Sequence, residues 1–95
     1  MENQHRKISG YRELSQEEIN LMNRIKAFGP QLSELCKDIE NYLNVQRSAA
    51  FVGQGVEELE RLDSAEPFTW MIEGKYTLQV GLMKLTRAIA QPGFF

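Results

Sequence analysis

The chain has 95 residues, 42% of them hydrophobic, so it can form one small domain with a limited core. Its 11 basic and 13 acidic side chains give a formal net charge of −2, which argues against binding to polymeric DNA or RNA. No apolar run approaches the roughly 20 residues of a membrane span, and the polar N-terminus lacks the apolar core of a signal peptide, so we expect a soluble intracellular protein.

The first segment, residues 1–14, is polar and irregular, and we interpret it as a ligand-binding arm. Residues 1–12 contain three cationic side chains against one carboxylate, whereas residues 34–66 contain 3 basic and 8 acidic side chains. Positive charge concentrated at the front of an acidic chain suits a small anion better than a long polyanion. Gly10 lets a backbone approach a ligand closely, and Tyr11 offers a face for stacking, although a tyrosine ahead of a helix also serves as a hydrophobic staple.

The second segment, residues 15–46, is predicted to be one helix kinked at Pro30. Ser15 and Glu18 match the capping box S-x-x-E, so the helix should begin at Gln16. Apolar residues and one glycine then recur in alternating steps of three and four, at Met22, Ile25, Gly29, Leu32, Cys36, Ile39 and Leu43. This stripe keeps its phase across the proline, which favours a continuous helix over a break.

Two further helices are predicted, over residues 55–62 and 65–91. The first is short because Gly53 and Gly55 weaken the helical pattern before it. The second has Pro67 in its first turn, and a Gln-Pro-Gly sequence stops it. Its apolar positions with helical spacing are Met71, Leu78, Leu82, Leu85 and Ile89. The fold class is therefore all-α: two long antiparallel helices with a short helix between them and an irregular N-terminal arm.

Several large apolar residues lie off these stripes, at Phe28, Leu35, Phe51, Phe68, Trp70, Met83, Phe94 and Phe95. Two helices cannot bury all of them, and a chain of this size often needs disulfides, a metal or partner subunits. One cysteine excludes an internal disulfide, and with one histidine it leaves too few ligands for a typical zinc site. The sequence therefore predicts a homo-oligomer; the alternative is that these residues thicken a monomer core around the short helix.

Four more side chains are candidates for contacts with an anionic ligand. Arg6 and Arg12 could clamp phosphates because a guanidinium presents a bidentate fork, or they could belong to a solvated charged tail. Asn23 and Lys26 lie at i and i+3 of the first predicted helix, off its apolar stripe. Lys26 could hold a phosphate or lie over an aromatic base, although a solvated position is the usual state of a helical lysine.

No arrangement of residues typical of an enzyme or a cofactor site is apparent. His5 has no serine, cysteine or carboxylate at a spacing that defines a catalytic pair, and no phosphate-binding loop, dinucleotide-binding fingerprint or zinc spacing occurs. The carboxylates of the short helix are predicted to form a solvated face, not a metal cluster. We therefore expect no catalysis, no metal and no cofactor.

Three blocks of sequence together resemble the phage anti-CBASS sponge family. They are N-Q-H-R-K-I-S-G-Y-R-E-L at 3–14, E-I-N-L-M-N-R-I-K at 18–26 and L-Q-V-G-L-M-K-L-T-R-A-I-A-Q-P at 78–92. Proteins of that family capture the cyclic oligonucleotide signals of bacterial immunity without cleaving them. The resemblance implies a protein that acts in the cytoplasm of the infected bacterium by sequestering cyclic dinucleotides such as 3′,3′-cGAMP.

The resemblance also implies an assembly and a site. The assembly is an all-helical hexamer of interlocked dimers, in which Tyr11 of one protomer and Lys26 of its partner would sandwich a base. A separate pocket for cyclic trinucleotides has a threonine where this chain has Phe28, and an arginine before the tryptophan where this chain has Thr69 before Trp70. Because these departures remove a phosphate clamp, we expect cyclic trinucleotides to bind weakly or not at all.

Two other functions compete with the sponge hypothesis. A small helical oligomer could inhibit a host protein through its aromatic surface, with the basic arm merely solvated. An enzyme that hydrolyses the signal is disfavoured, because no acid–base pair or metal site can be assembled from the sequence. Retention of a cyclic dinucleotide after purification would separate a sponge from a protein-binding inhibitor.

Overall fold

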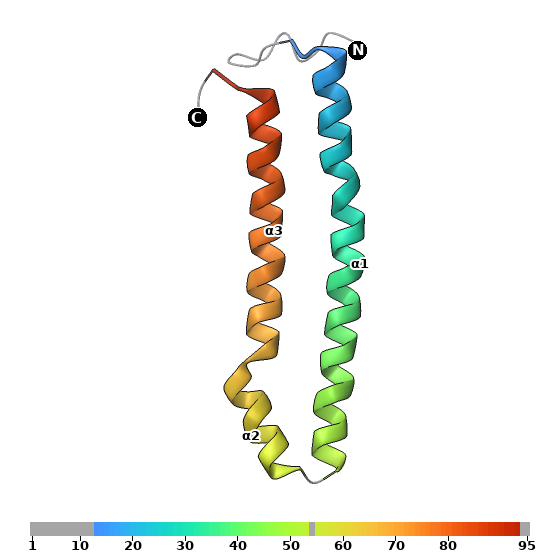
Figure 1. Ribbon diagram of the computed structural model, residues 1–95, viewed down its shortest axis with the longest axis vertical. Coiled ribbons are helices and arrows are strands. Elements are labelled where there is room, and N and C mark those ends of the chain that lie inside the picture. Colours follow the sequence, from blue (N-terminus) through green and yellow to red (C-terminus); the bar gives the residue numbers. More distant parts are fainter. Residues whose placement is uncertain (1–12, 54, 94–95) are drawn as a thin grey trace. The chain divides into compact units, whose positions relative to one another are not determined.

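The computed structural model describes residues 13–53 and 55–93. Three helices follow in chain order: α1 spans Gln16–Val52, α2 spans Val56–Ala65 and α3 spans Pro67–Ala90 (Figure 1). The part of the chain that the structure describes contains no strand, so the predicted all-α class is confirmed. None of these helices is both long enough and apolar enough to cross a membrane.

The start of α1 is the predicted capping box. The backbone N–H of Glu18 donates to Ser15 Oγ at 3.2 Å, and the backbone N–H of Ser15 donates to Glu18 Oε1 at 2.8 Å. These bonds satisfy two amides that have no partner within the helix, which is why the helix begins at Gln16.

Replacing Ser15 with alanine should destabilise the protein by about 1 kcal/mol, because the N–H of Glu18 loses its acceptor. The urea midpoint, followed by the helical circular dichroism signal, measures this change. Ser33→Ala is the matched control, since Ser33 is exposed in the interior of α1 and caps nothing. Equal midpoints for both variants would contradict the role of the cap.

The first helix is longer than predicted. It continues through Pro30, which confirms the predicted continuity, while a kink at this proline stays a prediction. The prediction that it ends at residue 46 is wrong: it ends at Val52, where Gly53 donates its N–H to the Ala49 carbonyl at 2.9 Å. The extra turns contain no glycine or proline and include two alanines, the strongest helix formers, so helix continues to the first glycine.

The boundary between α2 and α3 is a single residue, Glu66. The predicted bounds 55–62 and 65–91 are corrected here to Val56–Ala65 and Pro67–Ala90. Glu66 has φ 50° and ψ 52°, in the left-handed region, and its N–H donates to the Leu62 carbonyl at 3.0 Å. A residue before proline is disfavoured in the right-handed helical conformation, so α2 continues until Pro67 forces the change.

The end of α3, like that of α2, is a residue in the left-handed region followed by a proline. Gln91 has φ 48°, and its N–H donates to the Arg87 carbonyl at 2.9 Å. Pro92 comes directly after it and cannot continue the helix, so the predicted stop is confirmed and falls one residue earlier, at Ala90.

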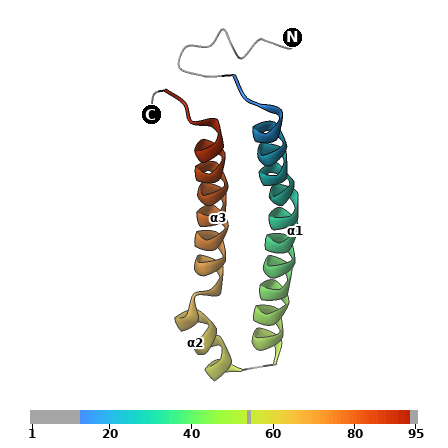
Figure 2. The same ribbon diagram turned by 45° about the horizontal axis from the view of Figure 1, so that its top comes forward.

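The chain divides into two compact units. Unit 1 consists of Met1–Gly29 and Gln79–Phe95, and unit 2 consists of Pro30–Leu78. In unit 1 the first part of α1 lies antiparallel to the last part of α3 (Figure 1 and Figure 2). In unit 2 the rest of α1 lies antiparallel to the start of α3, and α2 stands between them in the chain (Figure 1). The predicted antiparallel pairing is therefore confirmed within each unit.

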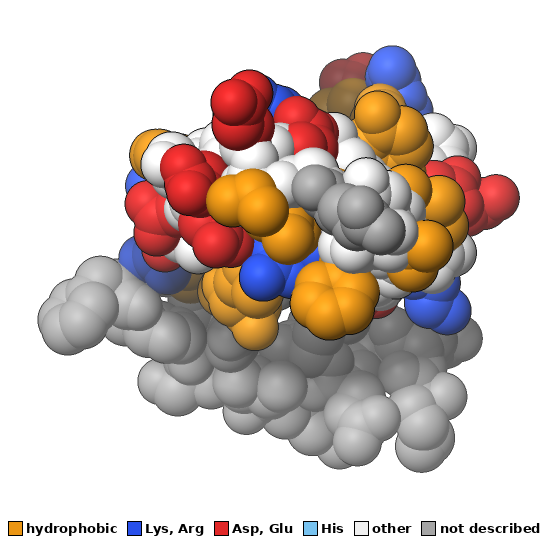
Figure 3. Space-filling model, turned by 90° about the horizontal axis from the view of Figure 1, so that it is seen from below, with side chains coloured by type: hydrophobic (Ala, Val, Ile, Leu, Met, Phe, Trp, Pro, Cys, Tyr) orange, Lys and Arg blue, Asp and Glu red, His pale blue; other side chains and the backbone are white. Residues whose placement is uncertain are grey.

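Very little of this structure is buried. Among the described residues only Leu43, Ala50 and Leu62 form a buried apolar core, and all three belong to unit 2. The large apolar side chains with more than half of their surface exposed are Phe28, Leu35, Tyr42, Val45, Phe51, Val52, Val56, Trp70, Tyr76, Met83 and Leu85. Figure 3 shows hydrophobic side chains lying open among charged ones. In the described part of a single copy, many large apolar side chains are therefore in contact with water.

Candidate ligand-binding site

The structure places two of the six predicted site residues. Asn23 and Lys26 both lie on α1 in unit 1, and both are exposed. Residues three apart on a helix are neighbours on its surface, so the amide and the ammonium can contact one ligand. The other four predicted site residues, Arg6, Gly10, Tyr11 and Arg12, lie outside the described residues.

The beginning of α1 is less favourable to an anion than a helix N-terminus without a cap. A helix N-terminus attracts phosphate through unpaired amides, but here the amide of Glu18 already has the Ser15 hydroxyl as its acceptor. Glu17 and Glu18 also place two carboxylates in the first turn. Lys26 lies ten residues, or about 15 Å, along α1 from Gln16, so a phosphate held by Lys26 would depend on side chains and not on the helix terminus.

Two side-chain amides near Asn23 and Lys26, those of Gln16 and Asn20, were not among the predicted site residues. Gln16 Nε2 donates to Asn20 Oδ1 at 2.9 Å, and both side chains are exposed. Gln16, Asn20 and Asn23 follow one another at steps of four and three, so they form an amide row along the exposed side of α1. That spacing was the signal in the sequence, and it was available without the structure.

A shallow hollow of about 240 Å³ lies between α1 and α3 within unit 1. It is lined by Leu21, Arg24, Ile25, Phe28, Leu85, Ala88 and Ile89. Phe28 follows Lys26 by two residues, which is about 200° around a helix, so the two side chains leave α1 in nearly opposite directions. The hollow is thus separate from the surface that carries Asn23 and Lys26, and its lining is apolar apart from one guanidinium.

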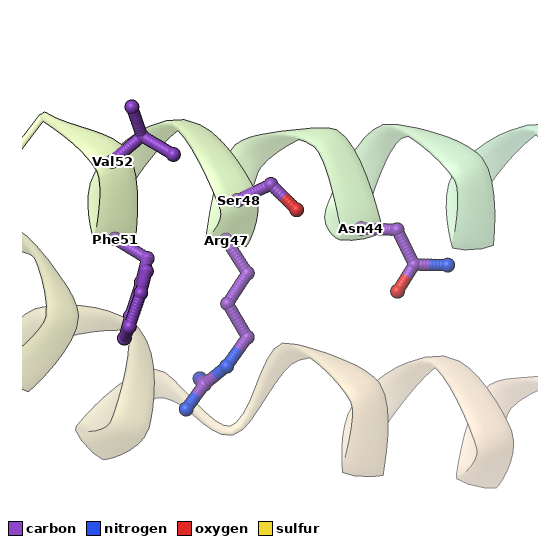
Figure 4. Close-up of a pocket in the computed structure, with 5 residues that line it drawn as sticks. All are labelled: Asn44, Arg47, Ser48, Phe51 and Val52. Atoms are coloured by element: carbon purple, nitrogen blue, oxygen red, sulfur yellow. The ribbon is translucent and has the colours of Figure 1, made fainter.

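A second hollow, of about 310 Å³, lies in unit 2 against the last turns of α1. Figure 4 shows its lining residues, with the side chains of Arg47 and Phe51 both directed from α1 toward the opposite ribbon. Arg47 Nη1 lies 2.9 Å from Asp63 Oδ1, so α1 and α2 are joined here by an ion pair. Because the guanidinium is already paired, this hollow offers no uncompensated positive charge to a phosphate.

The carboxylates of α2 are likewise partly engaged with a cation. The Arg61 guanidinium donates to both carboxylate oxygens of Glu58, at 2.8 and 2.6 Å. This hydrogen bonding lowers the pKa of Glu58 and raises the pKa of Arg61. Arg61 is therefore paired within its own helix, but both side chains are partly exposed, so the pair is weak and a phosphate can compete for the guanidinium.

Comparison with known proteins decides the family. No protein-family model matches the chain. Anti-CBASS protein 2 of Pseudomonas phage JBD67 is 43% identical over 105 aligned residues, covering 97% of this chain and 97% of the phage protein. The chain belongs to the anti-CBASS protein family. The match includes nearly the whole chain, so the three helices and the surface around Lys26 fall within one family relationship, and membership of the phage anti-CBASS family, inferred from the three sequence blocks, is confirmed.

Proposed function

We propose that this anti-CBASS family member blocks CBASS defence by sequestering cyclic dinucleotides such as 3′,3′-cGAMP without cleaving them. The observation that carries the proposal is the 43% identity, over nearly the full length, to a protein named for its action against CBASS. An exposed lysine and an exposed asparagine on adjacent turns of α1 support a ligand of this kind, because a cyclic dinucleotide presents phosphates and base edges together.

In the proposed site, Lys26 of one protomer and Tyr11 of its partner enclose one base. The ammonium lies over the ring while the tyrosine stacks on the other face. Arg6, Gly10 and Arg12 of the arm approach the phosphates, and Asn23 donates to or accepts from the ligand beside Lys26. A ligand with two bases and two phosphates matches a twofold dimer, since each protein residue is then used twice.

The proposed site requires an oligomer, and the exposed apolar surface supports one. Trp70, Met83 and Phe51 are each about 70% exposed in a single copy, and α3 contributes no buried residue of its own. Apolar surface of this extent is typical of subunit contacts. We propose a homohexamer built from interlocked dimers, in the cytoplasm of the infected host, where the signal is made.

Cyclic trinucleotides are proposed to be poor ligands. The position expected to carry an arginine before Trp70 holds Thr69 instead, so a phosphate clamp is missing there. Phe28, more than half exposed, occupies the other departing position and adds bulk to the hollow it lines in unit 1. Arg61 would have to leave its bidentate pair with Glu58 to compensate for the missing clamp.

A second candidate function is direct inhibition of a host protein. The observation that favours it is the exposure of Trp70, Tyr42 and Phe51 in unit 2, since aromatic side chains of this kind are enriched in protein interfaces. In that case the chain would block the defence without retaining nucleotide.

Purified protein should retain 3′,3′-cGAMP, and release it intact on denaturation. The test is to incubate protein with the nucleotide, remove unbound ligand, denature the protein and chromatograph what is released. We expect unchanged nucleotide at about one molecule per two chains, because one ligand lies between two protomers. Light scattering on the same sample gives the mass of the assembly.

Three outcomes would contradict parts of this proposal. Linear products that increase with time and protein concentration would show turnover. No retained nucleotide, with CBASS still inhibited, would favour direct protein inhibition. A monomer at micromolar concentration would exclude the shared site.

A further inference from the structure

Of the amide row Gln16, Asn20 and Asn23, only Asn23 has an assigned role in the site described above. All three side chains are exposed, and Lys26 follows Asn23 by three residues. Asn20, Asn23 and Lys26 therefore form one ridge of residues three apart, along which successive side chains are neighbours. A ligand held by Lys26 and Asn23 would meet Asn20 next along this ridge.

The hydrogen bond within the row orients the Asn20 side chain. Gln16 Nε2 donates to Asn20 Oδ1 at 2.9 Å, so the carbonyl oxygen of the Asn20 amide is turned toward the start of α1. The Nδ2 group, with two hydrogens, is then directed away from Gln16. An exposed asparagine without such a partner would present either end of its amide, whereas this one presents a donor.

Resting on the proposed function, we infer that Asn20 is a specificity-determining residue that favours guanine over adenine in the bound cyclic dinucleotide. The Hoogsteen edge of guanine presents two acceptors, N7 and O6, whereas that of adenine presents the N7 acceptor and the N6 amino donor. A fixed Nδ2 donor is complementary to the guanine edge. Against adenine the same donor faces an amino group at one of the two positions.

Loss of one such hydrogen bond on an exposed surface changes affinity by about threefold to tenfold. Asn20→Ala should therefore weaken binding of cyclic di-GMP by this factor and weaken cyclic di-AMP less, because adenine offers the donor one acceptor, N7, where guanine offers two. The ratio of the two affinities is the informative quantity. Both ligands carry two phosphates, so any general electrostatic effect of a substitution cancels in the ratio.

The sharpest test is the substitution Gln16→Glu. A glutamate carboxylate cannot donate to Asn20 Oδ1, but it can accept from Asn20 Nδ2, which turns the amide round and presents Oδ1 outward. We expect the affinity ratio of cyclic di-GMP to cyclic di-AMP to fall below that of Asn20→Ala. Oδ1 then repels guanine O6 and accepts from adenine N6. A purely structural role for Gln16 would change both affinities alike.

The experiment titrates full-length protein with cyclic di-GMP and cyclic di-AMP in a calorimeter. The variants are Asn20→Ala and Gln16→Glu, with Gln31→Ala as the matched control because Gln31 is an exposed amide elsewhere on α1. Helical signal and assembly mass are checked for each variant.

The two proposals fail in different ways. A parent protein that binds neither nucleotide overturns the proposed function and this inference with it. A parent that binds, with the affinity ratio unchanged in both Asn20→Ala and Gln16→Glu, overturns this inference alone and leaves the sponge function standing. A ratio that falls in both variants but not in Gln31→Ala supports the inference.

Discussion

Replacing Tyr11 with alanine should weaken cyclic dinucleotide binding by about 30-fold to 10⁴-fold. Stacking of one base on an aromatic side chain contributes on the order of 1 to 3 kcal/mol. Because the twofold site uses each residue twice, the loss should be about 2 to 6 kcal/mol, at about 1.4 kcal/mol for each factor of ten. Calorimetric titration with 3′,3′-cGAMP measures the change.

Lys26→Ala should be comparably damaging, and Lys26→Arg should keep part of the affinity because a guanidinium also stacks on a base. The matched control is Lys37→Ala, since Lys37 is an exposed lysine of the same helix in unit 2. Glu58→Ala, on α2, should leave binding unchanged. If Tyr11→Ala and Lys26→Ala both assemble and bind as tightly as the parent, the proposed site is wrong.

The second large effect concerns folding, where Leu62→Ala should lower the free energy of unfolding by about 2 to 5 kcal/mol. Leu62 is 4% exposed and is the most buried of the three core residues. Removing three of its carbon atoms loses apolar burial and leaves a cavity. In a domain whose total stability is on the order of 5 to 15 kcal/mol, such a loss is a large fraction.

Urea unfolding at one fixed protein concentration measures this effect, because the midpoint of an oligomer depends on concentration. Leu62→Met is the matched control and should cost less than about 1.5 kcal/mol, since it conserves volume. Glu60→Ala, exposed on the same helix, should change the midpoint little. If Leu62→Ala were as stable as Leu62→Met, burial of the Leu62 side chain would not contribute to the stability of the fold.

The parts of the fold that depend on near neighbours were predictable. Ser15 and Glu18 are three residues apart, so their capping box could be identified from the sequence, and both of its hydrogen bonds are present. The stop at Pro92 follows in the same way from the chemistry of one residue. Continuity of α1 across Pro30 was also predictable, because the apolar stripe does not change phase there.

The parts that were not predictable depend on competition between weak local preferences. Gly53 and Gly55 marked the region between α1 and α2. Whether the turns just before Gly53 are helical depended on small differences in helix propensity and on contacts with the rest of the fold. The change of direction at Glu66 needed a left-handed conformation in a residue that rarely adopts it, and the sequence placed it only within a few residues.

The described features of the candidate site depend on residues that are close together in the sequence, so they were also predictable. The exposure of Asn23 and Lys26 followed from helical phase alone, and the structure agrees with it. The hydrogen bond between Gln16 and Asn20 has the same local character and could have been inferred from spacing. The pairing of Arg61 with Glu58 is equally local, since the two residues are three apart on α2 and neighbours on its surface.

By itself the sequence determined where α1 begins, which face of α1 is polar and which family the chain resembles, because caps, periodicity and motifs act over a few residues. Only the tertiary structure decided which apolar residues a single copy buries. Leu43, Ala50 and Leu62 are covered while Trp70, Phe51 and Met83 are not. Arg47 meets Asp63 across 16 positions of sequence, which no local pattern encodes. Burial and such distant pairs depend on how helices pack, and packing is a property of the folded chain, not of any one segment.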